Sequence, residues 1–162
     1  MLFNRVPRSV EVCAVALVAA LTASIAAAES EETSRQINLL PRYRQECGVC
    51  HIAYPPGMLP AASWQRILGN LQHHFGTDAS LDADSVRQIS TWLAANSAGD
   101  AAAHTVPPED RITRSHWFRQ EHAEVSADVW KRPMIKSASN CAACHTRAEQ
   151  GNFNEHFIRI PQ

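Results

Sequence analysis

The sequence predicts an all-α fold in which short helices are separated by long loops. Apolar residues recur every three or four positions at about 63–76, 82–97 and 115–125, a spacing typical of amphipathic helices. Strand patterns are scarce, and only the FIRIP sequence at 157–161 has an extended character. The Gly, Ala, Pro and Asp content of AGDAAAHTVPPED, at 98–110, is that of a linker.

The N-terminal segment has the pattern of a secretory signal peptide. Two arginines precede an apolar run, 12–25, that ends in three alanines before the acidic ESEE sequence. An uncleaved membrane anchor is the alternative, but the run is short for a span of about 20 residues and contains Thr22 and Ser24. We therefore expect cleavage after Ala28, which removes residues 1–28 and leaves no membrane span.

Removal of the signal peptide also removes Cys13, so the mature chain keeps four cysteines, which form two C-x-x-C pairs. In an oxidising compartment, isolated pairs of this kind need another covalent or metal partner. The mature chain has 13 Lys and Arg against 15 Asp and Glu, a formal charge of −2. This balance excludes a basic nucleic-acid-binding protein, and the length is that of one exported domain.

Each cysteine pair is followed at once by histidine, as CGVCH at 47–51 and CAACH at 141–145. Two intervening residues fit a tight helical turn that aims both sulfurs at the vinyl groups of one haem, and the histidine can then bind the iron. We call these sequences the first and second motifs. They predict one haem on Cys47, Cys50 and His51 and another on Cys141, Cys144 and His145.

Two other uses of C-x-x-C pairs are alternatives to c-type haem. Zinc or iron held by four thiolates does not require histidine after both pairs. A thioredoxin-like redox pair needs a strand-helix-strand pattern that is absent near both motifs.

The linker at 98–110 then divides the mature chain into two haem-binding halves, 29–97 and 111–162. The whole is predicted to be a mostly helical chain with long loops wrapped around two covalently bound haems.

The first half offers His74 as the second ligand of its iron. If one helix runs from Pro60 or Ser63 to Gly76, its apolar face includes residues 64, 67, 68, 71 and 75. His74 then borders this face, whereas His73 points to solvent. A core-edge histidine bonded to a carbonyl is the alternative role for His74.

In the second half, Ser115 can cap a short helix that carries Trp117, Phe118 and Val125. His122 lies one turn from Phe118 and is the preferred distal ligand, with His116 as its rival. The thioethers of Met58 and Met134 are further alternatives, Met58 being too close to His51 to reach the opposite haem face. His104 and His156 are expected to be solvated.

The sequences ECGVCHIAYPPGMLPAASW, HHFG, ASL, WFRQEH, VW, NCAACH and GNF occur in this order over nearly the whole mature chain. This series resembles the small periplasmic dihaem cytochromes c. The resemblance implies a mostly helical electron carrier with bis-histidine irons, and its distal ligands match His74 and His122. It also implies exchange with a small oxygen-binding monohaem cytochrome c or a membrane b-type cytochrome. His116, just before WF, departs from the family pattern.

We therefore expect a periplasmic electron carrier that is not an enzyme. A haem enzyme or gas-binding sensor, with one open or labile iron, is the alternative and needs acid-base groups beside a vacant position. A zinc-stabilised binding module would be colourless. Carbon monoxide binding to the reduced protein distinguishes the electron carrier from the haem enzyme or gas-binding sensor.

Overall fold

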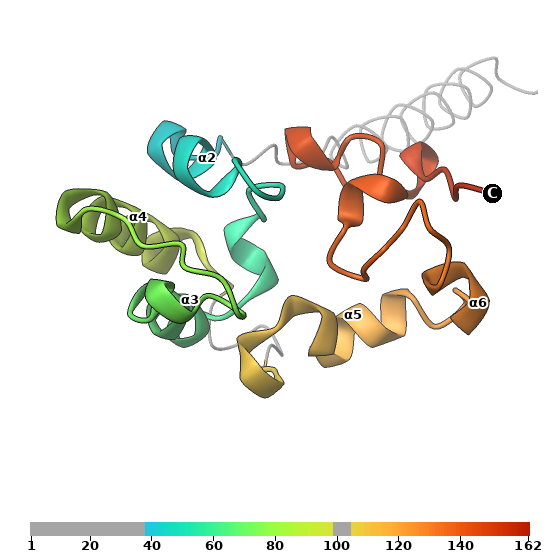
Figure 1. The fold of residues 1–162 in the computed structure, drawn as a ribbon, viewed down its shortest axis with the longest axis horizontal. Coiled ribbons are helices and arrows are strands. Elements are labelled where there is room, and N and C mark those ends of the chain that lie inside the picture. The colour runs from blue at the N-terminus through green and yellow to red at the C-terminus, as the bar shows by residue number, and fades with distance from the viewer. Residues whose placement is uncertain (1–37, 99–104) are drawn as a thin grey trace, which may run out of the picture. The chain divides into compact units, whose positions relative to one another are not determined.

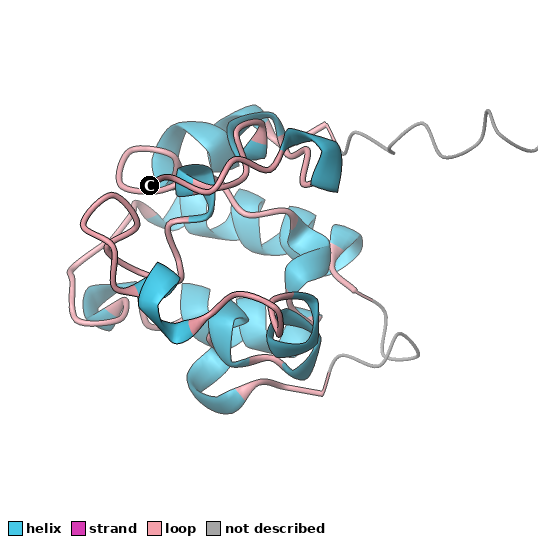
Figure 2. Ribbon diagram, turned by 90° about the vertical axis from the view of Figure 1, so that its right-hand side faces the viewer, coloured by secondary structure: helices cyan, strands magenta, loops and turns pink. Residues whose placement is uncertain are grey.

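The computed structural model describes residues 38–98 and 105–162, and within these ranges every regular element is a helix or a 3₁₀ turn (Figures 1 and 2). The all-α prediction is therefore confirmed. The expected signal peptide, His104 and residues 99–104 of the 98–110 linker lie outside the described residues. The α-helices are α2 (Pro41–Cys47), α3 (Ala61–Leu68), α4 (Ala83–Asn96), α5 (His116–Glu121) and α6 (Ala127–Trp130).

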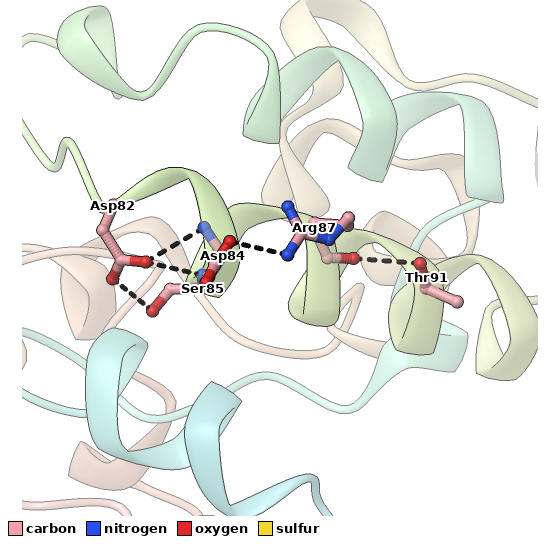
Figure 3. Close-up of polar contacts among 5 residues, drawn as sticks. All are labelled: Asp82, Asp84, Ser85, Arg87 and Thr91. Atoms are coloured by element: carbon pink, nitrogen blue, oxygen red, sulfur yellow. Dashed lines mark hydrogen bonds and ion pairs between the residues drawn. The ribbon is translucent and has the colours of Figure 1, made fainter.

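Helix α4 begins with a side-chain cap at Asp82. The carboxylate of Asp82 accepts hydrogen bonds from the backbone N–H groups of Asp84 and Ser85, both at 3.0 Å (Figure 3). These bonds satisfy donors that have no partner within the helix. Ile89 and Leu93, one turn apart, are fully buried, so the helix predicted at 82–97 is present and its apolar face points inward.

The core of the first half forms where α2 and α3 pack against α4 (Figure 1). Trp64 on α3 is 6% exposed and donates its indole N–H to the carbonyl of Pro56 at 2.7 Å. Tyr43 on α2 is 2% exposed, and its ring lies 5.4 Å from that of Trp92. This apolar cluster includes nine buried residues, Leu39, Tyr43, Ala53, Leu59, Trp64, Leu68, Leu71, Ile89 and Leu93.

The predicted helix at 63–76 is shorter than expected. Helix α3 ends at Leu68, with Gly69 as its C-cap, and a separate 3₁₀ turn covers Leu71–His73. Phe75 has a positive φ of 49° and is 44% exposed, so its assignment to a buried helical face was wrong. The guanidinium of Arg111 lies 4.5 Å from the centre of the Phe75 ring, which supports this exposed position through a cation–π contact.

The second half consists of shorter elements. Ser115 caps α5 as predicted, because its hydroxyl accepts a hydrogen bond from the Phe118 N–H at 3.2 Å. Helix α5 ends at Glu121, however, so Val125 is not part of it. The FIRIP sequence forms no strand; it contributes only an isolated bridge between Ile158 and His145.

Candidate haem-binding sites

The first motif lies where α2 ends. Cys47 is the last residue of this helix, and the chain turns sharply through 48–50 to His51. A side chain at Gly48 would collide with the carbonyl oxygen of Arg44, so the close turn requires glycine. The Nδ1–H of His51 donates to the Ile52 carbonyl at 2.7 Å. In a neutral ring this bond leaves Nε2 without a proton and able to bind a metal ion.

His74 faces His51 across a short space. Their ring centres are 6.0 Å apart and their planes are inclined by 24°. A nitrogen of imidazole binds a metal ion at about 2 Å, so two imidazoles on opposite sides of one ion have centres about 6 Å apart. The His51–His74 pair therefore has the spacing needed to hold an iron between the two rings.

His74 also has an unsatisfied polar atom. Its Nδ1 is buried and has no hydrogen-bond partner within the described part of the chain. Burial, and then the neighbouring His51, lower the pKa of His74. A neutral imidazole is the form that binds metal, so this environment suits a ligand.

The second motif has the same kind of opposite histidine. Cys141 opens a 3₁₀ turn that ends at Ala143, and the His145 ring lies 6.1 Å from that of His122, with planes inclined by 67°. The Nδ1–H of His122 donates to the Phe118 carbonyl at 2.8 Å. The Phe118 ring stacks on His122 with centres 4.1 Å apart. Helix α5 therefore fixes both the position and the orientation of His122.

His145 resembles His74 in its environment. Its Nδ1 is buried without a partner among the described residues, and burial, followed by His122, lowers its pKa. The ring of Phe153 lies 5.3 Å away. Each pair therefore combines one histidine held by a carbonyl with one whose Nδ1 is buried and unbonded.

The rival ligands lie in less suitable places. His73 and His116 are exposed, and the Nδ1 of His73 pairs with the Asn70 side chain at 3.1 Å. Met134 is 66% exposed, and Met58 is half-buried in the 3₁₀ turn Pro56–Met58. His156 is exposed, as expected.

No disulfide joins the four motif cysteines to one another or to another described residue. Burial, with the Glu46 carboxylate, raises the pKa of Cys47 to about 11, and burial also raises the pKa of Cys141 and Cys144. Across residues 38–98 and 105–162, no group of three or more Cys, His, Asp or Glu side chains gathers into a metal site. The four thiols are thus arranged as two separate pairs and not as one four-thiolate centre.

The model of the dihaem cytochrome c family matches residues 43–153, which contain both motifs and both opposed histidines. The chain belongs to the dihaem cytochrome c family. Membership implies two c-type haems with iron, and the two thiols and paired imidazoles at each motif fit such a group in number and spacing.

Solved structures support the same conclusion. A dihaem cytochrome c from Shewanella baltica is 36% identical, with a TM-score of 0.66, and the match covers 75% of this chain and 92% of that one. Two structures of this family from Rhodobacter sphaeroides are 44% and 40% identical, with TM-scores of 0.62 and 0.65. These matches cover 72% and 73% of this chain and 99% of each of those chains. No curated protein matches the chain.

Several contacts around the haem sites of this dihaem cytochrome c were not predicted. Helix α2, which leads into the first motif, has only a short sequence signal, the proline at its first turn. Tyr54 lies in the ECGVCHIAYPPGMLPAASW sequence, which assigns it no role of its own, yet its ring lies 4.8 Å from that of His51. The carbonyl of Phe118, which holds His122, is a backbone group, so the sequence carries no direct sign of its role.

The C-terminal segment supports the second motif. The backbone N–H of Arg159 donates to the Cys144 carbonyl at 2.8 Å, and the Thr146 hydroxyl donates to the Phe157 carbonyl at the same distance. The tail is thereby bonded to the residues on either side of His145. Among the described residues, no helix is long and apolar enough to cross a membrane.

Proposed function

We propose that this dihaem cytochrome c is a periplasmic electron carrier in which each iron is bound by two histidines. Cys47 and Cys50 attach the first haem, and Cys141 and Cys144 attach the second. The proposed iron ligands are His51 with His74 and His145 with His122. When bound, each haem supplies an iron that accepts and releases one electron.

The observation that carries this proposal is the presence of two histidine pairs, at 6.0 and 6.1 Å between ring centres. Ligands on both sides of an iron leave no position for a substrate, which favours a carrier over an enzyme. Bis-histidine ligation also favours a lower reduction potential than histidine–methionine ligation. The N-terminal signal pattern and covalent haem attachment both support export to the periplasm.

The proposed partners are other redox proteins. A small oxygen-binding monohaem cytochrome c and a membrane b-type cytochrome are the candidates that the family resemblance implies. Such encounters bury little surface and are transient. Val49, between the two cysteines of the first motif, is 79% exposed, so this residue is accessible to a docking protein.

The decisive experiment is the visible spectrum of the fully reduced, mature protein before and after addition of carbon monoxide. We expect no change, because both irons keep two protein ligands. A shift in about half of the haem absorbance would contradict the proposal. It would instead favour the gas-binding or enzymatic alternative at one site.

A further inference from the structure

Tyr54 contacts the first haem-binding motif and the loop that leads into the second. It follows His51 by three residues, and the two rings lie 4.8 Å apart with planes inclined by 24°. Its hydroxyl donates a hydrogen bond of 2.8 Å to the carbonyl of Ser139. Ser139 is 85 positions further along the chain and only two residues before Cys141. A single side chain therefore joins the first proximal histidine to the loop that begins the second motif.

Both ends of this connection are anchored. The carbonyl of Tyr54 accepts a hydrogen bond of 2.8 Å from the hydroxyl of Tyr43, which belongs to the buried core. At the other end, the side-chain amide of Asn140 donates to the Ile135 carbonyl at 3.1 Å, and Ile135 is 1% exposed. The Tyr54–Ser139 bond thus links two segments that are each held in place by other contacts.

The carbonyl of Ser139 also lies close to the second attachment site. The sulfur of Cys141 is 3.7 Å from this oxygen. In the proposed attachment, this sulfur is one of the two that would form thioether bonds to the second haem. The sequence of contacts is therefore the His51 ring, the Tyr54 ring and hydroxyl, the Ser139 carbonyl and the Cys141 sulfur.

We propose that Tyr54 is a positioning residue for electron exchange between the two haem sites. The inference rests on the proposed electron-transfer function. Coupling between sites is carried by packed side chains and hydrogen bonds, and this chain of contacts supplies both kinds. In each exchange, one electron leaves a ferrous site, which becomes ferric, and reduces the other site from ferric to ferrous. Tyr54 is not itself oxidised, and no proton or further reactant takes part.

The test compares three variants of the mature protein with both haems attached. Tyr54→Phe removes the bond to Ser139 but keeps the ring beside His51, and Tyr54→Leu removes both contacts. Thr91→Val is the control, because it removes a hydroxyl-to-carbonyl hydrogen bond, of 2.9 Å to Arg87, that is local to α4 and lies on its exposed side. A photogenerated reductant is supplied in less than one equivalent per protein, so that one haem is reduced first. The absorbance change that follows measures the redistribution of electrons between the haems. This phase is recognised by its independence of protein concentration.

We expect redistribution to be several-fold slower in Tyr54→Phe and slower still in Tyr54→Leu, with Thr91→Val close to wild type. Paramagnetic resonance spectra and the two midpoint potentials are recorded for each variant. Unchanged resonance spectra in Tyr54→Phe would show that the iron sites are intact, so that slower exchange reports the lost connection.

An unchanged rate in Tyr54→Phe, at unchanged potentials, would overturn the inference and leave the carrier function intact. Absence of a redistribution phase in the wild type would also overturn it, because there would be no internal exchange to position. Failure of the proposed function is read separately, from carbon monoxide binding to the wild type. Loss of a haem in Tyr54→Leu would leave Tyr54→Phe as the deciding variant.

Discussion

The two halves of the chain place similar histidine pairs on very different supports. The first pair lies beside a core formed by α2, α3 and α4, with nine buried apolar residues. In the second half, the described residues include only three buried hydrophobic residues, Phe118, Ile135 and Ala148. Since apolar burial drives folding, the first half has a protein core of its own, whereas the second half needs its haem to supply one.

The comparison extends to the ring orientations. The planes of the first pair are inclined by 24°, and those of the second pair by 67°. The cause lies in the neighbours: the carbonyl of Ile52 holds His51, whereas His122 is fixed by both the carbonyl and the ring of Phe118. The two histidine pairs therefore differ in the relative orientation of their rings, although both are proposed to bind an iron in the same way.

The largest predicted effect comes from removing one haem at a time. Cys141→Ala combined with Cys144→Ala should abolish the second haem and expose the backbone of 115–161 to solvent, because little other apolar material stabilises it. The matched variant, Cys47→Ala with Cys50→Ala, should lose the first haem but keep α3 and α4 protected. Haem content and residue-resolved hydrogen exchange measure both effects. Equal protection of 115–161 in the two variants would contradict the proposed difference between the halves.

The next effect concerns the protein core of the first half. Leu93 is completely buried, so Leu93→Ala should lower the free energy of unfolding by about 2–5 kcal/mol. Denaturant unfolding monitored by far-ultraviolet circular dichroism measures this loss. The control is Ala94→Gly on the exposed face of the same helix, which should cost only about 1 kcal/mol. A loss in Leu93→Ala no larger than in the control would mean that haem contacts, and not α4 packing, stabilise this half.

A smaller, local effect is expected at the ring of His122. Phe118→Leu removes the stacked ring but keeps the backbone carbonyl, so the imidazole should remain bonded yet gain rotational freedom. The relative orientation of two axial imidazoles affects the electronic structure of a low-spin iron. We therefore expect the electron paramagnetic resonance signal of the ferric second site to shift, while the signal of the first site remains unchanged. A shift in both signals, or in neither, would show that Phe118 does not set the orientation at the second site.

The sequence predicted the features that depend on local chemistry. The two motifs, the Asp82 start of α4 and the Ser115 cap of α5 each follow from neighbouring residues, and all are present as helical or turn structure. Family membership and the two haems were likewise predicted correctly from the motifs and their order. The ligand assignment of His74 and His122 stays a prediction.

The errors arose where a periodic pattern continued across a break in structure. The apolar spacing from Trp64 to Phe75 suggested one helix, although Gly69 and Asn70 are turn-forming residues within it. The Ala79 N–H donates to the Leu71 carbonyl at 2.9 Å, which folds this segment back on itself. His74 therefore reaches His51 from a turn and not from a helical face. The Tyr54–Ser139 bond could not be predicted, because no local pattern relates residues 85 positions apart.

The smallest predicted effect concerns the contact between Arg66, on α3, and the turn at 108–110. The Arg66 guanidinium donates two hydrogen bonds to the Asp110 carboxylate, at 2.6 and 2.9 Å. These bonds lower the pKa of Asp110 below its ordinary value of 3.8. The folded state therefore binds the Asp110 proton less tightly than the unfolded state, so this contribution to stability is present above about pH 4 and is lost as pH falls further.

Asp110→Asn should remove this part of the acid dependence and leave stability near pH 7 only slightly reduced, because the pair is partly exposed. Thermal unfolding measured between pH 3 and 7 checks the change. The control is Asp128→Asn, which removes the exposed ion pair between Asp128 on α6 and Lys131 just after it. An identical pH profile for Asp110→Asn and wild type would show that this ion pair does not stabilise the contact between α3 and the 108–110 turn.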